Sequence, residues 1–451
     1  MTHDSYIDAV RSQLANIQIS RPVGRVSSVE GGVIHLSGIG KFARIGDRVE
    51  VRRAGKDLLS GEVVQLNVDA LTMLPDGTLD GVALGDRATV HEPASVYPSE
   101  SWIGRIIDPN GNAIDDQPLR KGPFSRPLNA LPPAAARRRG LGPRLSTGSA
   151  VFDTMLPLAK GQRIGLFAGS GVGKSSLIGQ FAQNVDADVV VIAMIGERGR
   201  EIRHFVDDIL GPEGLSRSIV IAATSDQSAL IRRRCAWTAM TVAEFFRDQG
   251  KSVLLLADSI TRFAEAHREI AVAAGEAPVL RGHPPSAVPA IMSLCERAGP
   301  GTDDQGDITA VFSVLVAGSD MDEPVADILR GVLDGHVVLD RTIAERGRYP
   351  AVDLLRSISR SLPGAATDEQ NQLISQVRKI LGTFDRNEMM ISAGLYSHGS
   401  DPEIDQAIQV WPELDSFMAK IQSRSIKDSF DQLGLIMRRA IAPKSTYGIN
   451  R

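Results

Sequence analysis

Residues 168–175, Ala-Gly-Ser-Gly-Val-Gly-Lys-Ser, carry the chemistry that this sequence encodes most clearly. A short apolar run at 163–167 precedes them, and a helix-like segment at 176–182 follows them. Strand, glycine-rich loop and helix form the context in which successive backbone N–H groups cradle phosphate oxygens. An ordinary glycine-rich turn is the competing interpretation, but the Gly-Lys-Ser ending and both flanks favour a phosphate site.

Each residue of this loop has an expected role in holding a triphosphate. Lys174 is placed to reach the β- and γ-phosphates, and the Ser175 hydroxyl is placed to bind Mg²⁺. The N-terminus of the following helix adds partial positive charge. The usual first glycine of such a loop is Ala168 here, a small residue that still fits. The predicted nucleotide-binding residues of the loop are Gly169, Ser170, Gly171, Val172, Gly173, Lys174, Ser175 and Ser176.

Two carboxylates follow apolar strands further along the chain. Asp258 ends the run 252–258, where it suits a magnesium ion shared with Ser175, directly or through water. Glu197 follows the run 188–194 and is the candidate to orient and polarise the attacking water. Arg198 is the candidate to neutralise phosphate charge. A charged helix start with internal ion pairs is the alternative for this segment, and it explains Glu201 well.

A third cluster, residues 349–360, is less informative. Its composition indicates a turn followed by the start of a helix. Tyr349 could be a core residue and Arg360 a surface charge, and the residues alone do not decide between these readings and a functional one.

The elements that must position these groups form a chain of several domains. Strands and helices alternate from about Gly161 to Arg360, and near-continuous apolar strands predict a mainly parallel sheet covered on both faces. Short, evenly spaced apolar runs between glycine turns predict a small N-terminal β-barrel. Helix-length segments at 370–381 and 425–441 predict a C-terminal helical domain. The expected units are 1–20, an amphipathic segment; 21–95, the β-barrel; 96–150, a connector; 151–365, the P-loop (RecA-like) domain; and 366–451, the helical domain.

Composition limits the setting in which the protein works. A net charge of -4 gives no basic field for nucleic acid or anionic lipid. The basic run 136–140 lacks interleaved aromatic residues, so a solvated linker surface is favoured over a nucleic-acid patch. Two cysteines, Cys235 and Cys295, indicate a reducing compartment. The sequence shows neither a signal-peptide pattern nor an apolar run of the ~20 residues that span a bilayer, so we expect a cytoplasmic protein.

Together these segments resemble the catalytic subunits of the rotary ATP synthase superfamily, and above all the flagellar and type III protein-export ATPases. The resemblance extends over essentially the whole chain and is densest from Gly161 to Arg360. It is carried by the phosphate loop with its strand and by four further segments: 195–201, 258–271, 333–339 and 349–360. The C-terminal part lacks the acidic loop by which synthase catalytic subunits engage their rotor, which argues against an energy-conserving synthase.

The resemblance implies an Mg²⁺-dependent ATPase that forms a homohexameric ring with nucleotides at the subunit interfaces. It places Tyr349 against the adenine and makes Arg360 an arginine finger for the nucleotide of the neighbouring subunit. The expected catalytic set is therefore Lys174, Glu197, Arg198 and Arg360. The resemblance also implies that residues 3–19 bind a stator-like regulator. The C-terminal domain is expected to face chaperone–substrate complexes and the membrane export gate, at the cytoplasmic face of the inner membrane.

Three alternatives stay open at this point. A virulence-associated type III secretion ATPase would have the same core chemistry as a flagellar one. A ring helicase or RNA translocase should carry stacking aromatic residues in its front domain, and few are found there. A noncatalytic nucleotide-binding subunit usually lacks the glutamate that stands here as Glu197.

Residues 3–19 could equally be a helix packed on its own protein.

Overall fold

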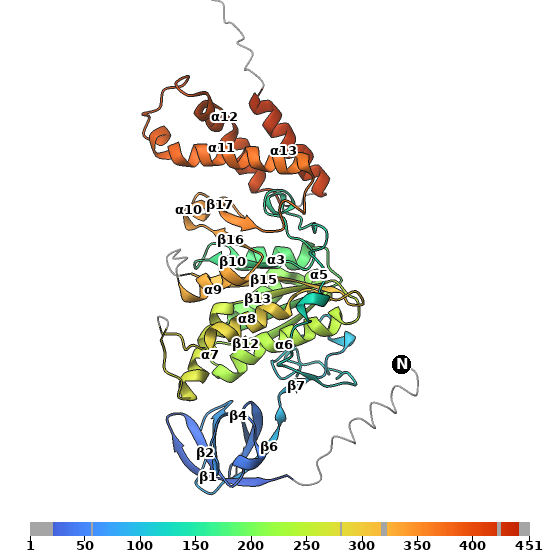
Figure 1. The fold of residues 1–451 in the computed structure, drawn as a ribbon, viewed down its shortest axis with the longest axis vertical. Coiled ribbons are helices and arrows are strands. Elements are labelled where there is room, and N and C mark those ends of the chain that lie inside the picture. Colours follow the sequence, from blue (N-terminus) through green and yellow to red (C-terminus); the bar gives the residue numbers. More distant parts are fainter. Residues whose placement is uncertain (1–20, 56, 280–281, 317–322, 422–424, 442–451) are drawn as a thin grey trace, which may run out of the picture.

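The computed structural model describes residues 21–441 except 56, 280–281, 317–322 and 422–424. Three units are stacked along the long axis of the molecule, with a β-barrel at one end, an α/β domain in the middle and helices at the other end (Figure 1). The fold class predicted from the sequence is therefore confirmed. The expected regulator-binding helix at 3–19 lies outside the described residues.

The N-terminal barrel closes from antiparallel strands in the order β1-β2-β5-β4-β3-β6. Alternate side chains, among them Ile34, Leu36, Val49 and Val51, point inward and are buried. Closure of the barrel leaves no exposed strand edge, and this helps a small terminal domain to stay folded. The barrel strands are β1 (Val23–Glu30), β2 (Val33–Ser37), β3 (Asp47–Arg52), β4 (Leu58–Leu66), β5 (Ala70–Pro75) and β6 (Arg87–Pro93), with a 3₁₀ turn η1 (Gly40–Phe42).

The connector is more integrated into the molecule than its composition suggests. Its strand β8 (Ile106–Ile107) pairs in parallel with β12 and so becomes the edge of the central sheet. In the basic run 136–140, the Arg138 side chain is largely buried and donates to the backbone carbonyl of Pro133. The predicted solvated surface is thus wrong for Arg138. The other short elements are β7 (Ser95–Val96), η2 (Glu100–Trp102), β9 (Arg126–Pro127), η3 (Ala135–Arg137) and α2 (Ala150–Asp153).

The central sheet has the strand order β17-β16-β10-β15-β13-β11-β12-β8, with β14 paired to β15. Every neighbouring pair is parallel except β16 with β17 and β14 with β15. Its strands are β10 (Arg163–Ala168), β11 (Val189–Glu197), β12 (Ser218–Thr224), β13 (Val253–Asp258), β14 (Gly299–Pro300), β15 (Asp307–Leu315), β16 (Gly335–Leu339) and β17 (Val352–Ser359).

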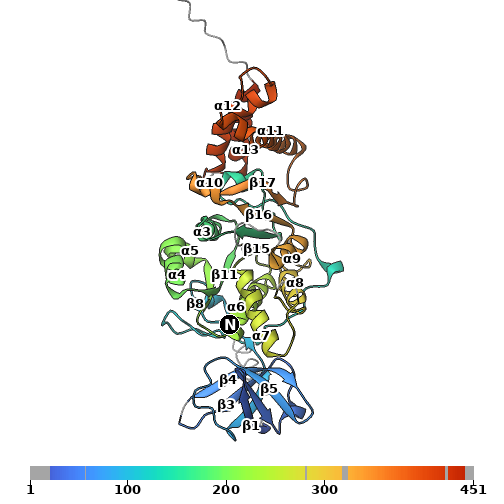
Figure 2. The ribbon, with the colours of Figure 1, turned by 90° about the vertical axis from the view of Figure 1, so that its left-hand side faces the viewer.

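Both faces of this sheet are buried, as the apolar strands predicted. Val190 and Ile192 join one core cluster, whereas their neighbours Val189 and Val191 join the other. The helices of the two faces lie on opposite sides of the sheet in Figure 2. These helices are α3 (Lys174–Asn184), α4 (Gly199–His204), the π-helix η4 (Phe205–Leu210), α5 (Gly211–Ser216), α6 (Ala229–Arg247), α7 (Ile260–Ala273), α8 (Ala287–Arg297), α9 (Pro324–Val332) and α10 (Arg341–Glu345).

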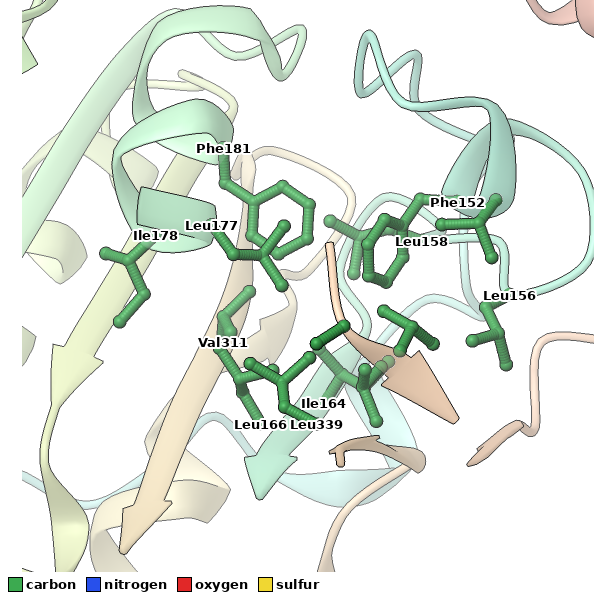
Figure 3. Packing of buried hydrophobic residues seen from close by; sticks show 14 of the residues in the cluster. Phe152, Leu156, Leu158, Ile164, Leu166, Leu177, Ile178, Phe181, Val311 and Leu339 are labelled. Atoms are coloured by element: carbon green, nitrogen blue, oxygen red, sulfur yellow. The ribbon is translucent and has the colours of Figure 1, made fainter. Parts of the chain in front are cut away.

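The packing of α3 fixes where the phosphate loop opens. Leu177 and Phe181 of α3 lie above Val311 and Leu339 of the sheet, and Phe152 meets Phe181 edge-on with ring centroids 4.9 Å apart (Figure 3). Because the buried apolar face of α3 is held in this way, its N-terminus stays directed at the carboxyl end of β10.

Residues 352–359 correct one expectation, because they form strand β17 rather than the start of a helix. Val352 and Leu354 face the core, and the strand pairs antiparallel with β16, with Ser359 opposite Gly335. Serine and arginine at its other positions hide the alternation in the sequence, so the partner strand decides the conformation.

In its described residues, the C-terminal unit consists of three helices: α11 (Asp368–Ser392), α12 (Pro402–Met418) and α13 (Ile426–Ile441). A capping box of Thr367 and Gln370 begins α11, and Asp401 caps α12. Helix α12 was not expected from the sequence. No helix within the described ranges is long and apolar enough to cross a membrane.

Candidate nucleotide site

The predicted phosphate loop connects the carboxyl end of β10 to the first turn of α3. Gly171 and Gly173 have φ values of +77° and +86°, a conformation that residues with a side chain rarely adopt. Gly173 occupies the N-cap position of α3, and Lys174 is the first residue of the helix. The loop thus leaves the unpaired N–H groups of α3 directed outward, where they can meet an anion.

Lys174 and Asp258 meet at the carboxyl edge of the sheet. The Lys174 ammonium forms an ion pair with the Asp258 Oδ1 atom, and the Ser313 hydroxyl donates to the same oxygen at 2.7 Å. Only 11% of the Lys174 side chain and 8% of the Asp258 side chain are exposed. The structure therefore brings the predicted phosphate-binding cation and a carboxylate together in one partly desolvated site.

The same site contains the oxygen ligands that Mg²⁺ prefers. The Asp258 carboxylate and the Ser175 hydroxyl are hard donors, and Ser175 follows Lys174 directly at the start of α3. Protein sites commonly hold Mg²⁺ through one or two such oxygens together with phosphate oxygens of the substrate. These residues fit a magnesium ion that arrives with a nucleotide, which would shield phosphate charge when bound.

Glu197 is the last residue of β11, the strand next to β13 in the sheet. The register against β12 shifts between Ile195 and Glu197, and Gly196 between them has a φ of +69°. This bulge re-aims the strand end toward the site. The pKa of Glu197 is raised to about 7, mainly by burial and next by the negative charge of Asp258, while the positive charge of Lys174 opposes both effects. A carboxyl group that titrates near neutrality is suited to exchange a proton with water.

Arg198 occupies the N-cap position of α4, and its side chain is exposed. One guanidinium nitrogen lies 3.7 Å from Glu201, three residues along the helix. The alternative of an intrahelical pair is therefore present in this structure. Arg198 also lines the cavity beside the phosphate loop, which is compatible with the predicted contact to phosphate. That contact stays a prediction.

A cavity of about 790 Å³ joins these groups, and we call it the phosphate-side cavity. It is lined by the loop residues 168–171 and 173–176, by Glu197 and by Arg198. Further lining residues, which the sequence did not mark as site residues, include Glu201, His204, Ser225, Thr261, Arg262, Glu265 and Glu323. Arg262 lies in the first turn of α7, four residues after Asp258. A basic residue one helical turn after a strand-ending aspartate is the sequence pattern that could have identified Arg262 as a residue of the site.

Tyr349 packs against Gly173, a residue that lines both this cavity and a second one. A Cβ atom at Gly173 would come within 3.0 Å of the Tyr349 ring, so the absence of a side chain there makes room for the aromatic ring. Tyr349 is 46% exposed and lines a second cavity of about 400 Å³, which we call the base-side cavity. Its other walls include Ser176, Gln180 and Ile421, the last of which belongs to the C-terminal unit.

Arg360 is the one predicted catalytic residue that lies apart from the others. Its backbone N–H donates to the carbonyl of Asp334 at 2.9 Å, and its guanidinium donates to the Arg330 carbonyl at 3.3 Å. The Asp334 carboxylate in turn binds Arg163, the first residue of β10. The phosphate loop begins at the opposite end of β10, roughly 17 Å away for a strand of this length. Within one chain, Arg360 therefore cannot reach the phosphates.

The fold and the loop define a P-loop ATPase domain flanked by a barrel and a helical unit. A model of the ATP synthase alpha/beta family, nucleotide-binding domain, matches residues 148–359, and a model of the T3SS EscN ATPase C-terminal domain matches residues 366–434. A flagellum-specific ATP synthase of Caulobacter vibrioides is 42% identical over 95% of this chain and 99% of its own length. A type 3 secretion system ATPase of Xanthomonas euvesicatoria is 38% identical over 90% of this chain and 92% of its own length.

Solved structures agree with these relationships. The assembled ATPase EscN of the enteropathogenic E. coli type III secretion system is 35% identical, with a TM-score of 0.85 over 92% of this chain and 99% of that chain. The same ATPase in complex with its central stalk EscO has a TM-score of 0.83. This chain belongs to the family of flagellum-specific ATP synthases and type III secretion ATPases.

Proposed function

We propose that the protein hydrolyses ATP as a homohexameric ring and thereby powers protein export by a flagellar type III system. The separation of Arg360 from Lys174 within one chain carries this proposal. A site that has the phosphate loop, Asp258 and Glu197 but no second cation for the γ-phosphate is incomplete. A neighbouring copy that offers Arg360 across a subunit interface completes it.

Each residue of the site then has its own role in ATP hydrolysis. Lys174 and the loop N–H groups hold the phosphate oxygens, while Asp258 and Ser175 bind the accompanying Mg²⁺. Glu197 orients the water and accepts its proton. Arg198 and the neighbour's guanidinium neutralise the charge that develops on the γ-phosphate. Tyr349 stacks on the adenine ring and holds its position in the base-side cavity.

The flagellar system is favoured by the names of the relatives, since the flagellum-specific ATP synthases of Caulobacter vibrioides and Bacillus subtilis are both 42% identical. The type 3 secretion ATPase from Xanthomonas euvesicatoria is 38% identical. A virulence-type system is the second candidate, and the genes that neighbour this one would decide between them. An RNA translocase is not favoured, because the barrel sequence 21–95 contains Phe42 as its one aromatic residue.

The proposed partners follow the three units of the chain. Residues 1–20 would bind a stator-like regulator. Helices α11–α13 would face the export chaperones with their cargo and the export gate, which places the ring at the cytoplasmic face of the inner membrane. The solved complex of EscN with its central stalk EscO supports a further contact of this chain with a central-stalk protein.

The test measures ATP hydrolysis against protein concentration, with molecular mass in solution determined in the same samples. We expect activity per subunit to rise steeply as hexamers form. Full activity in samples that contain only monomers would contradict the shared site. RNA-stimulated hydrolysis would instead support the translocase.

A further inference from the structure

Helix α12 is connected to both walls of the base-side cavity. Three residues after α12 ends, Ile421 lines this cavity, and the preceding Lys420 accepts a hydrogen bond from the Ala150 N–H at 3.0 Å. On the other wall, Tyr349 follows Arg348, whose side chain reaches α12. The C-terminal unit is therefore part of the construction of this cavity and does not merely cover it.

The Arg348 side chain braces the backbone segment that directly follows Tyr349. Its Nη1 and Nη2 atoms donate to the carbonyls of Pro350 at 3.3 Å and Val352 at 2.8 Å. Its side chain is only 7% exposed. A cation buried to this extent fixes its surroundings, because each lost hydrogen bond leaves a charged donor unsatisfied.

Asp415 supplies the countercharge from α12. Its Oδ1 atom lies 3.0 Å from Arg348 Nε, although the geometry is not that of a hydrogen bond, so the contact is electrostatic. Burial lowers the pKa of Arg348 and the Asp415 carboxylate raises it again. Beside the pair, a cavity of about 140 Å³ leaves the interface between α12 and β17 incompletely packed. The charge pair therefore acts beside the apolar core, to which both Val352 and Leu414 of α12 belong, in holding α12 to this turn.

Helix α12 does not move independently of α11. Trp411 of α12 stacks on Phe384 of α11 with ring centroids 4.3 Å apart and an interplanar angle of 4°. A displacement of the α11–α12 pair would reach Asp415, then Arg348, and then the segment that carries Tyr349.

We propose that Arg348 is a positioning residue that, held by Asp415 of α12, sets the place of Tyr349 opposite Ile421 and so sets the affinity for the nucleotide base. This inference rests on the proposed ATPase function. It gives the C-terminal helices a direct effect on nucleotide affinity without any contact to the phosphates.

Asp415→Asn tests this, because it removes the countercharge with little change in shape. We expect the KM for ATP to rise about fivefold, as for the loss of a partly buried ion pair, and kcat to stay within about twofold. Inorganic tripolyphosphate, which has no base, should inhibit the variant and the wild type equally. A merely structural effect would weaken ATP and tripolyphosphate alike, and that result, or an unchanged KM, would overturn the proposal.

Two further variants sharpen the test. Arg348→Lys keeps the charge opposite Asp415 but cannot brace both carbonyls, so we expect the same rise in KM. Glu388→Gln is the matched control, since Glu388 of α11 pairs with Arg346 at 2.8 Å and joins the same two units without bracing Tyr349. It should leave the KM unchanged, and an equal rise would refute the specific role of Arg348.

A failure of the proposed function would be recognised separately. If the wild type hydrolyses no ATP, that function fails. Calorimetric binding of ATP and tripolyphosphate to wild type and Asp415→Asn would then still decide the inference, because selective weakening of ATP supports it and equal affinities contradict it.

Discussion

The ammonium of Lys174 contacts the carboxylate of Asp258, so the group expected to bind phosphate and the group expected to bind magnesium neutralise each other in this structure. Bound Mg·ATP would offer each of them a new partner, because Lys174 would bind phosphate oxygens and Asp258 would bind Mg²⁺. Each of the two buried charges would thus keep a partner of opposite charge when the substrate binds.

Lys174→Ala should abolish hydrolysis and also destabilise the empty protein. Removal of the ammonium leaves Asp258 as a buried carboxylate whose one remaining side-chain hydrogen bond, among the residues that the structure describes, comes from the Ser313 hydroxyl. We expect the free energy of unfolding to fall by about 1–3 kcal/mol, measured by urea denaturation. In the control Lys174→Ala/Asp258→Asn the buried carboxylate is absent, and much of the lost stability should return. A single variant as stable as the wild type would contradict this role of the pair.

The pH dependence of turnover should report Glu197. The base form is needed to accept a proton, and the pKa of Glu197 is raised to about 7. We therefore expect kcat/KM to fall about tenfold per pH unit below pH 7, because kcat/KM reports ionisations of the free enzyme. Glu197→Gln should abolish hydrolysis. A profile that is flat between pH 5 and pH 7, or a Gln variant that turns over, would exclude Glu197 as the base.

The raised pKa of Glu197 also predicts the sign of a stability change. Because the folded state binds this proton more tightly than the unfolded state, the stability it contributes is full below pH 4.5, the ordinary value, and is lost as pH rises through about 7. Relative to the wild type, Glu197→Gln should therefore become more stable as pH rises across this window. Melting temperatures of the two proteins at pH 5 and pH 8 check the trend, and an equal difference at both values would refute it.

A buried charge cluster should govern how firmly the barrel is held to the nucleotide domain. Arg234 of α6 is 2% exposed and donates to Asn110 at 2.8 Å, while Asp76 at the end of the barrel lies 3.5 Å from it. Arg234→Met leaves this carboxylate with one partner fewer, so we expect a loss of about 2–4 kcal/mol in the free energy of unfolding.

The control for this variant is Arg341→Met on α10. Arg341 is 75% exposed and pairs with Glu345 one helical turn away at 2.9 Å. Its loss should change stability by no more than about 0.5 kcal/mol. Urea denaturation of both variants measures these changes in the free energy of unfolding. Similar losses of stability in the two variants would show that the burial of Arg234 has no special effect.

Much of the fold and the candidate site was predictable because the signals are local. The phosphate loop, its flanking elements and the strand-ending Asp258 and Glu197 each depend on patterns within about ten neighbouring residues. The family resemblance then assigned Tyr349 and Arg360, which the residues alone left undecided.

The features that sequence reasoning missed depend on distant partners. Strand β17 is a strand because β16 pairs with it, and its own alternation is obscured by serine and arginine. The burial of Arg138 depends on carbonyls such as that of Ala298, which folding brings alongside it. Ile421 reaches the base-side cavity through the packing of α12. No local pattern encodes these relationships.

Mixing two inactive variants tests the shared site most directly. Lys174→Ala lacks the phosphate-binding cation and Arg360→Ala lacks the finger, yet a mixed ring contains interfaces with one intact Lys174 facing one intact Arg360. Under conditions where both variants assemble, we predict that mixing restores measurable hydrolysis to two proteins that are inactive alone. If mixed hexamers form and remain inactive at every ratio, the two residues do not serve one site across an interface.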